Sequence, residues 1–269
     1  MRIALYRLLA AVAAFGFPLL AEAQTSEVRG TINFPGRQIA GPPIIGAPFS
    51  AERVSERVQI GSDGTRFTLK NSQETIYRDS QGRTRTERPV MVGPGPQLSS
   101  VPVIVVIQDP VAHVGYMLDP QNKVAHRVAL ESANGASTPH LARSAAPRAA
   151  AEQGAGPNPG PGPETVSQDL GQQVIEGVPA EGHRRVLNWP AGSMGNDQPF
   201  QTTSEYWFSA DLNENVLSKS TDPRSGQSIT RLINISRAEP SADMFAPPAD
   251  YSVVDETAPF HIQWTAARP

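Results

Sequence analysis

Apolar and polar residues alternate in short segments along most of this chain. Val54, Val58 and Ile60 share one face of a segment that runs into Asp63-Gly64, a hairpin turn signal. Val103–Ile107 is a continuous apolar run, which is typical of a strand buried on both faces. Strand after strand joined by short turns predicts an antiparallel meander, and hence a mainly β fold with few short helices.

The same pattern continues on both sides of a Gly- and Pro-rich tract. The other predicted strands are Phe67–Leu69, Ile76–Tyr77, Val114–Leu118, Val124–Leu130, Val174–Val178, His183–Leu187, Ser204–Ala210, Val216–Ser220 and Ile229–Ile235. The predicted turns are Ser80-Gln81-Gly82, Asp119–Asn122, Gly177–Gly182 and Leu212–Asn215. Helical periodicity is scarce, and single helical turns are expected only near Ser50–Glu56 and Ser241–Phe245.

The first residues have the order of a cleavable secretory signal. Arg2 and Arg7 precede an apolar run over 8–20, and Ala21-Glu22-Ala23 supplies the small residues of a cleavage site. The run is shorter than the ~20 residues that span a bilayer, and no cysteine follows it for lipid attachment. We therefore expect cleavage near Ala23 and a periplasmic or secreted protein.

Composition divides the rest of the chain into four parts. Residues 24–48 are a Pro/Gly-rich extended arm, and 131–164 are an Ala/Gly/Pro-rich linker or loop with little to bury. Residues 49–130 are the predicted first half of an antiparallel sheet, and 165–269 are its second half with a C-terminal tail. No apolar segment after residue 23 is long enough for an integral membrane protein.

Charge and cysteine content narrow the possible partners. The net charge is −3 with no basic cluster, which argues against nucleic acid as a partner. Cysteine is absent, so a fold in an oxidising compartment would have to be held by its core.

Ser193 is the one candidate nucleophile. Ala191-Gly192-Ser193-Met194-Gly195 is a degenerate nucleophile elbow, a motif that needs a strand before the serine and a helix after it. Asn196, Asp197 and Pro199 follow instead, and they do not favour a helix. A small-residue loop is the simpler interpretation, and we predict no catalytic residues.

Metal ligands are also not indicated. The five histidines lack zinc spacing, although His113 and His126 could meet across a hairpin. Asp211, Asn213 and Asn215 resemble the start of a calcium loop, but valine occupies the required glycine position, so an Asn-rich hairpin tip is expected. We predict neither metal nor cofactor.

A cluster of arginines precedes the buried apolar run. Its members are Arg78, Arg83, Arg85 and Arg88, interspersed with Asp79 and Glu87. The cluster is either a patch for anionic head groups or an acidic partner, or a solvated edge strand protected by charge.

The C-terminal third carries the residues of a family resemblance. Three strands lead to Glu239-Pro240, Met244-Phe245, Pro247-Pro248 and Tyr251. This part resembles the LolA-like periplasmic lipoprotein-carrier superfamily, which includes lipoprotein carriers, mycobacterial lipid-carrier lipoproteins and RseB-like sensor domains. The segment "YRDSQGRTRTER" also resembles exported proteins of soil bacteria, chiefly acidobacteria.

The resemblance covers 60–130 and 165–255 and implies one curved antiparallel sheet, a half-barrel whose hollow takes an acyl chain or a peptide. The chain departs from the family in lacking amphipathic lid helices and in its Ala/Gly/Pro tract. No binding residue is transferred one by one.

A meander that curves without closing leaves a groove on its concave face. The candidates for lining that groove, or for forming the core instead, are Phe67, Leu69, Ile76, Val105, Met117, Tyr206, Phe208 and Leu232. The sequence thus suggests an exported noncatalytic binding protein that carries or senses a lipid or a lipidated partner. An envelope protein–protein interaction module, using sheet edges and extended arms, is the alternative; a secreted serine hydrolase using Ser193 is the remote one.

Overall fold

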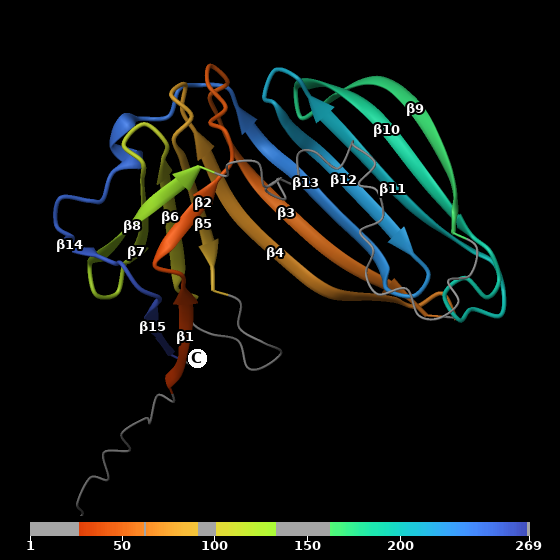
Figure 1. The fold of residues 1–269 in the computed structure, drawn as a ribbon, viewed down its shortest axis with the longest axis horizontal. Coiled ribbons are helices and arrows are strands. Elements are labelled where there is room, and N and C mark those ends of the chain that lie inside the picture. The colour runs from red at the N-terminus through yellow and green to blue at the C-terminus, as the bar shows by residue number, and fades with distance from the viewer. Residues whose placement is uncertain (1–26, 62, 91–100, 133–161, 268–269) are drawn as a thin grey trace, which may run out of the picture.

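The computed structural model describes residues 27–61, 63–90, 101–132 and 162–267, without the side chains of 69–71. These residues form fifteen strands and one short 3₁₀ turn (Figure 1). The elements are β1 (Glu27–Phe34), β2 (Arg37–Ala40), β3 (Phe49–Ile60), β4 (Arg66–Arg78), β5 (Thr84–Pro89), β6 (Val103–Asp109), β7 (Val114–Asp119), β8 (Val124–Ser132), β9 (Glu164–Ile175), β10 (Val178–Trp189), β11 (Phe200–Ser209), β12 (Glu214–Asp222), β13 (Gly226–Ser236), η2 (Ala242–Phe245), β14 (Ser252–Asp255) and β15 (Phe260–Ala267).

Two antiparallel meanders make up the main sheet. β3–β8 form one and β9–β13 form the other, and they join where β13 pairs with β3. The order β14-β8-β7-β6-β5-β4-β3-β13-β12-β11-β10-β9 does not close on itself, and the long strands curve strongly (Figure 1). The predicted mainly β fold, with a single curved antiparallel sheet, is confirmed.

Local sequence accounts for most turns. Asp119 accepts hydrogen bonds from the amides of Gln121 and Asn122, both at 3.1 Å, which builds the predicted turn between β7 and β8. At the predicted turn after β4, the Gly82 amide donates to the Asp79 carbonyl oxygen at 3.1 Å. Gly82 has a φ of 82°, which favours glycine.

Three local predictions are wrong. The predicted turn Gly177–Gly182 is strand from Val178 on, because these residues belong to β10 and pair with β9. The segment Val174–Val178 is not one strand, because Glu176 and Gly177 form a tight turn inside it, with φ values of 49° and 80°. Such a pair of positive φ angles is the geometry of a two-residue hairpin turn. The predicted helical turn over Ser50–Glu56 lies within β3, where pairing with β4 and β13 holds it extended. The predicted turn near Ser241–Phe245 corresponds to η2.

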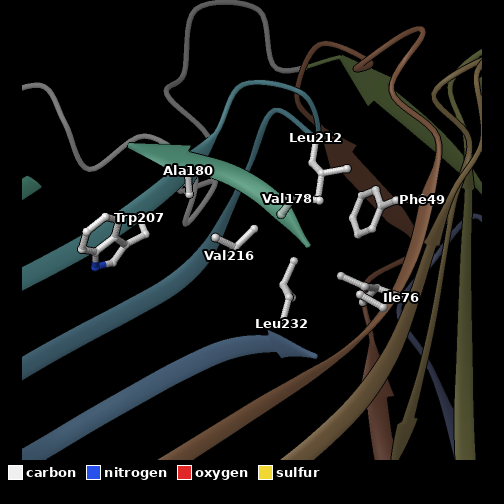
Figure 2. Close-up of a cluster of buried hydrophobic side chains, with 9 residues drawn as sticks. Phe49, Ile76, Val178, Ala180, Trp207, Leu212, Val216 and Leu232 are labelled. Carbon is white, nitrogen blue, oxygen red and sulfur yellow. The ribbon is translucent and has the colours of Figure 1, made fainter. Parts of the chain in front are cut away.

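One apolar cluster lies where the two meanders meet (Figure 2). Phe49 and Ile76 come from the first meander and Leu232 and Trp207 from the second, all with no more than 8% of their surface exposed. Side chains from both meanders are buried together in this cluster, and their burial stabilises the long-range pairing of β13 with β3. Its other buried members are Ala51, Val178, Ala180, Leu212 and Val216.

The strands β6–β8 are buried on both faces. On one face Val105, Ile107 and Leu118 pack under Phe245 of η2. On the other face Ile104, Met117 and Val128 pack under Ile262 of β15. The prediction that Val103–Ile107 is buried on both faces therefore holds from Ile104 on, whereas Val103 is exposed.

Residues 27–40 of the Pro/Gly-rich arm form two strands that contact distant parts of the chain. β1 pairs with β15 over its whole length, from Glu27 with Ala267 to Phe34 with Phe260. β2 pairs in parallel with β8. The predicted signal segment, 1–23, and most of the predicted linker, 133–161, lie outside the described residues.

The residues that carry the family resemblance contact one side of the sheet and the turn after β4. Glu239 accepts hydrogen bonds from the amide and hydroxyl of Ser80, each at 3.0 Å. Met244, Phe245 and Tyr251 pack on the β6–β8 cluster. These residues therefore stabilise the fold. No helix in the described part of the chain is long and apolar enough to cross a membrane.

Candidate binding site

The eight predicted groove residues do not share one face of the sheet. Ile76 and Leu232 meet in the cluster of Figure 2. Val105 pairs with Leu118 and Met117 pairs with Val106, so Val105 and Met117 point to opposite faces of the sheet.

Three of the remaining candidates lie away from the cluster. Tyr206 and Phe208 flank the buried Trp207, and by strand alternation they point to the face opposite its ring. Phe67 is exposed. Leu69 lies in β4, and its side chain is outside the described residues. Ligand binding by this set stays a prediction, and the structure directs attention to hollows elsewhere.

Ser193 lies in the loop between β10 and β11, with a strand after it and no helix. Its hydroxyl donates to the Pro190 carbonyl oxygen at 2.8 Å and lies 3.5 Å from Asn196 Oδ1. Asn196 also donates to the Pro190 carbonyl oxygen, so these groups stabilise the loop locally. The strand–turn–helix context that the nucleophile elbow requires is not present here.

The histidines and the calcium-like pattern do not converge. His113 lies beside Leu130, whose amide donates to its carbonyl oxygen, whereas His126 pairs with Met117 further along β8. Asp211 lies in the turn before β12, and Asp222, the residue at the twelfth position of the calcium-like pattern, is the last residue of this extended strand. In the described ranges no three His, Asp or Glu side chains are grouped as metal ligands.

The arginine cluster does not lie on an edge strand, because β5 pairs with both β4 and β6. Arg83 Nε donates to Asp79 Oδ2 and Arg85 Nε donates to Glu87 Oε1, each at 2.6 Å. Arg78 is buried and Arg88 is exposed. Two of the four arginines are thus paired with acidic neighbours in their own segment.

A hollow lies along the outer edge of β8. β14 pairs with Val124–Arg127 and β2 pairs with Ala129–Ser132, both in parallel, so the two short strands share one edge in tandem. Val128 lies between them. The hollow opens at this junction, with a volume of about 750 Å³. We call it the β8 groove; its lining residues are Pro35, Gly36, Arg37, His113, Val114, Arg127, Val128, Ala129, Glu131, Asp255, Glu256, Thr257 and Pro259.

The charges around the β8 groove are paired with one another. Arg127 Nη2 donates to Asp255 Oδ2 at 2.7 Å, and Arg37 Nη1 lies 3.4 Å from Glu131 Oε2. The hydrogen bond from Arg127 lowers the pKa of Asp255 and raises the pKa of Arg127, so both stay charged near neutral pH. Glu256 Oε1 lies 2.8 Å from His126 Nδ1.

The side chains between these pairs are apolar. Val114 and Ala129 are paired and turn to the same face of the sheet, and Pro35 and Pro259 come from the segments that connect it to β1 and β15. Val128 borders the junction, but its side chain is buried with Ile262 on the opposite face. The groove therefore combines an apolar floor with a polar rim on which both arginines are ion-paired and Glu256 adds a further carboxylate. Its residues come from four segments that are far apart in the sequence and share no pattern, so sequence reasoning missed it. The Pro/Gly density around residue 35 was the one local signal.

Comparison with known proteins returns structures only. No family model matches the chain, and no curated protein matches it. A crystal structure of MucB and that of the Pseudomonas aeruginosa MucA/MucB complex each match 77% of this chain, with 13% and 14% identity and TM-scores of 0.37 and 0.36. The chain spans 60% and 58% of the matched chains.

The crystal structure of LprF from Mycobacterium bovis also matches 77% of this chain and 91% of its own, with 11% identity and a TM-score of 0.33. Because these identities and TM-scores are low, the function of the chain has to be inferred from its own residues.

Proposed function

We propose that this chain is an exported, noncatalytic binding protein of the cell envelope that carries or senses a lipid or a lipidated partner through one acyl chain. The observation that supports the proposal is the β8 groove, with its volume of about 750 Å³ and its apolar floor. That volume lies within the ~300–1,000 Å³ that small-molecule sites occupy.

The edge of β8 favours an acyl chain over a peptide. A peptide that adds to a sheet needs free backbone donors and acceptors along several residues. β8 pairs with β14 and β2 on this edge at every residue from Val124 to Ser132 except Val128. An occupant must therefore bind chiefly through apolar contact, which an acyl chain provides.

The ion-paired arginines of the rim fit the same occupant. Arg127–Asp255 and Arg37–Glu131 are ion pairs with exposed side chains, so they stay hydrated while the floor between them is covered. An acyl chain can therefore cover the apolar floor of the groove without breaking either ion pair.

Replacing Ala129 by tryptophan is expected to abolish lipid binding. Ala129 is exposed and lines the β8 groove, so a large ring there fills the hollow without entering the core. The measurement is native mass spectrometry of full-length protein exported to a bacterial periplasm, followed by organic extraction. Added mass in the range of a fatty acid or phospholipid, released by solvent, is expected for the wild type and not for Ala129→Trp.

Ala210→Trp is the matched control, because Ala210 is an exposed alanine in the β11–β12 turn. It is expected to retain the ligand. Equal lipid in both variants would overturn the groove as the site. A clean apo mass for the wild type, with no uptake of added oleate, would overturn lipid binding altogether.

A specific observation supports the interaction module as the second candidate. β9 has twelve residues, pairs with β10 alone among the described strands, and is exposed over most of its length. It contains no lysine or proline, which commonly protect edge strands, although a bulge opposite Gly182 interrupts it. If no lipid is found, β9 is the next place to test for a partner that adds a strand.

A further inference from the structure

A second, smaller hollow lies on the first meander, beneath the segment that connects β2 to β3. Its volume is about 210 Å³. The connecting segment supplies Gly41–Ile44, and the sheet supplies side chains from β3 to β6. We call residues 41–48, which connect β2 to β3, the strap, and we call this hollow the strap pocket. The strap pocket is separate from the β8 groove.

Arg78 is a buried cation on the wall of the strap pocket. Only 4% of its surface is exposed. Its Nε donates to the Ala47 carbonyl oxygen at 3.0 Å, Nη2 donates to the Leu212 carbonyl oxygen, and the guanidinium lies 4.7 Å from the centre of the Phe49 ring. No carboxylate in the described part of the chain comes within 4.0 Å of it to form an ion pair, although arginine keeps its charge in proteins.

Such a cation is incompletely compensated. Two carbonyl oxygens and one aromatic face satisfy part of its hydrogen-bonding capacity but supply no negative charge. Burial lowers the pKa of Arg78, and Glu214 acts in the opposite direction from a greater distance. An anion in the adjacent hollow would supply the missing countercharge.

A second guanidinium lines the same pocket. Arg53 Nη1 donates to Glu74 Oε1 at 2.7 Å, and its Nη2 lies 4.0 Å from Glu214 Oε1. Arg53, Arg78 and Glu214 are the charged residues that line the pocket. Glu74 pairs with Arg53 from outside the lining, so Arg78 is the cation of the pocket that lacks a close carboxylate. Thr84, Thr86 and Gln108 add polar groups.

The rest of the lining is apolar and fixes the size of the occupant. Phe49, Ile76, Leu130 and Pro43 contribute carbon surface. A cavity of about 150 Å³ lined by such residues accommodates benzene. The extra volume of this pocket allows one further small group, and the arginines require that group to be anionic.

The strap is held in place without a ligand. β2 pairs with β8 before the strap, and the Gly46 amide donates to the Ser80 carbonyl oxygen at 2.9 Å near its far end. A Cβ on Gly82 would lie 3.0 Å from Pro43, so strap and turn are closely packed. A preformed pocket lowers the ordering cost of binding.

We infer that the strap pocket binds a small monocarboxylate whose apolar body is about the size of a benzene ring, with the carboxylate beside Arg78 and Arg53. The pocket is too small for the acyl chain proposed for the β8 groove, and the two sites function independently.

Calorimetric titration of the full-length protein with benzoate tests the inference, with benzamide as the neutral analogue. Benzoate is expected to bind and benzamide to bind at least about tenfold more weakly, because hydrogen bonds to a charged group are the stronger kind. Arg53→Gln is expected to weaken benzoate binding about tenfold. Glu214→Gln is expected to strengthen it, since it removes the only negative charge from the lining.

The expected gain in Glu214→Gln cannot result from misfolding, which would only lower affinity. Arg184→Gln, which breaks an ion pair with Glu205 elsewhere on the sheet, is expected to leave benzoate binding unchanged. Ala129→Trp is also expected to leave it unchanged, so failure of the lipid proposal and failure of this one are distinguishable. No benzoate binding at millimolar concentration, or equal affinity for benzamide, would overturn the inference.

Discussion

Phe245→Ala is expected to lower the free energy of unfolding by about 3–5 kcal/mol, the range for removal of a buried aromatic side chain. Phe245 is 2% exposed and covers Val105, Ile107 and Leu118 on one face of β6 and β7. The guanidinium of Arg83 lies 5.1 Å from its ring centre and would lose that contact as well. The loss is large because η2 is a single turn and provides no second aromatic residue to fill the space.

Urea unfolding followed by circular dichroism measures this loss. Met244→Ala is the matched control, since Met244 is the preceding residue in η2 and is only partly buried. Its carbonyl oxygen accepts from Arg85 Nη1 at 3.0 Å, and this bond survives the substitution. A loss below about 1 kcal/mol for Phe245→Ala would mean that η2 does not hold this face of the sheet.

Asp79→Asn is expected to destabilise the protein by about 2–4 kcal/mol, because it removes the charge from a buried hydrogen-bonded group. Asp79 is 1% exposed. Its Oδ1 accepts from the amides of Gln81 and Arg83 at 3.1 and 2.8 Å, and its Oδ2 accepts from Arg83 Nε at 2.6 Å. Asparagine has nearly the same shape but offers one acceptor oxygen in place of two.

A double-mutant cycle with Arg83→Gln measures how much of that loss comes from the ion pair. Coupling between the two positions is expected, with the double variant less destabilised than the sum of the single ones. Asp63→Asn is the comparison, because Asp63 makes a similar turn with Thr65 at an exposed position. Equal, small effects at Asp79 and Asp63 would contradict a specific role for burial at Asp79.

The predictable part of the fold is the part with apolar alternation. Segments such as Val114–Leu118 and Val124–Leu130 became β7 and β8, because their apolar side chains are buried in the clusters under Phe245 and Ile262. β9 was not predicted over most of its length, since its exposed polar residues carry no period-two signal. β1 and β15 were missed as a pair, because nothing in either segment specifies a partner more than 200 residues away.

The site could be predicted less well than the fold. Apolar alternation identified residues that are buried, such as Ile76 and Met117, but not the face to which each strand turns them. The face to which a side chain points depends on the register of its strand. At the β13–β3 junction this register is set between two strands that are far apart in the sequence. Glu214 and Arg78 were likewise unrecognisable as neighbours. The resemblance to acidobacterial exported proteins, and the signal peptide, stay predictions.

The pairing of β1 with β15 has a consequence for the order in which the protein is assembled. Ile32 and Phe34 pack with Phe260 and Ile262, at nearly the opposite end of the described chain. During synthesis β1 lacks its partner strand until β15, the last described strand, has emerged. Contacts of such long sequence separation form slowly, so the exposed β1 segment is where a chaperone or a protease would meet the nascent chain.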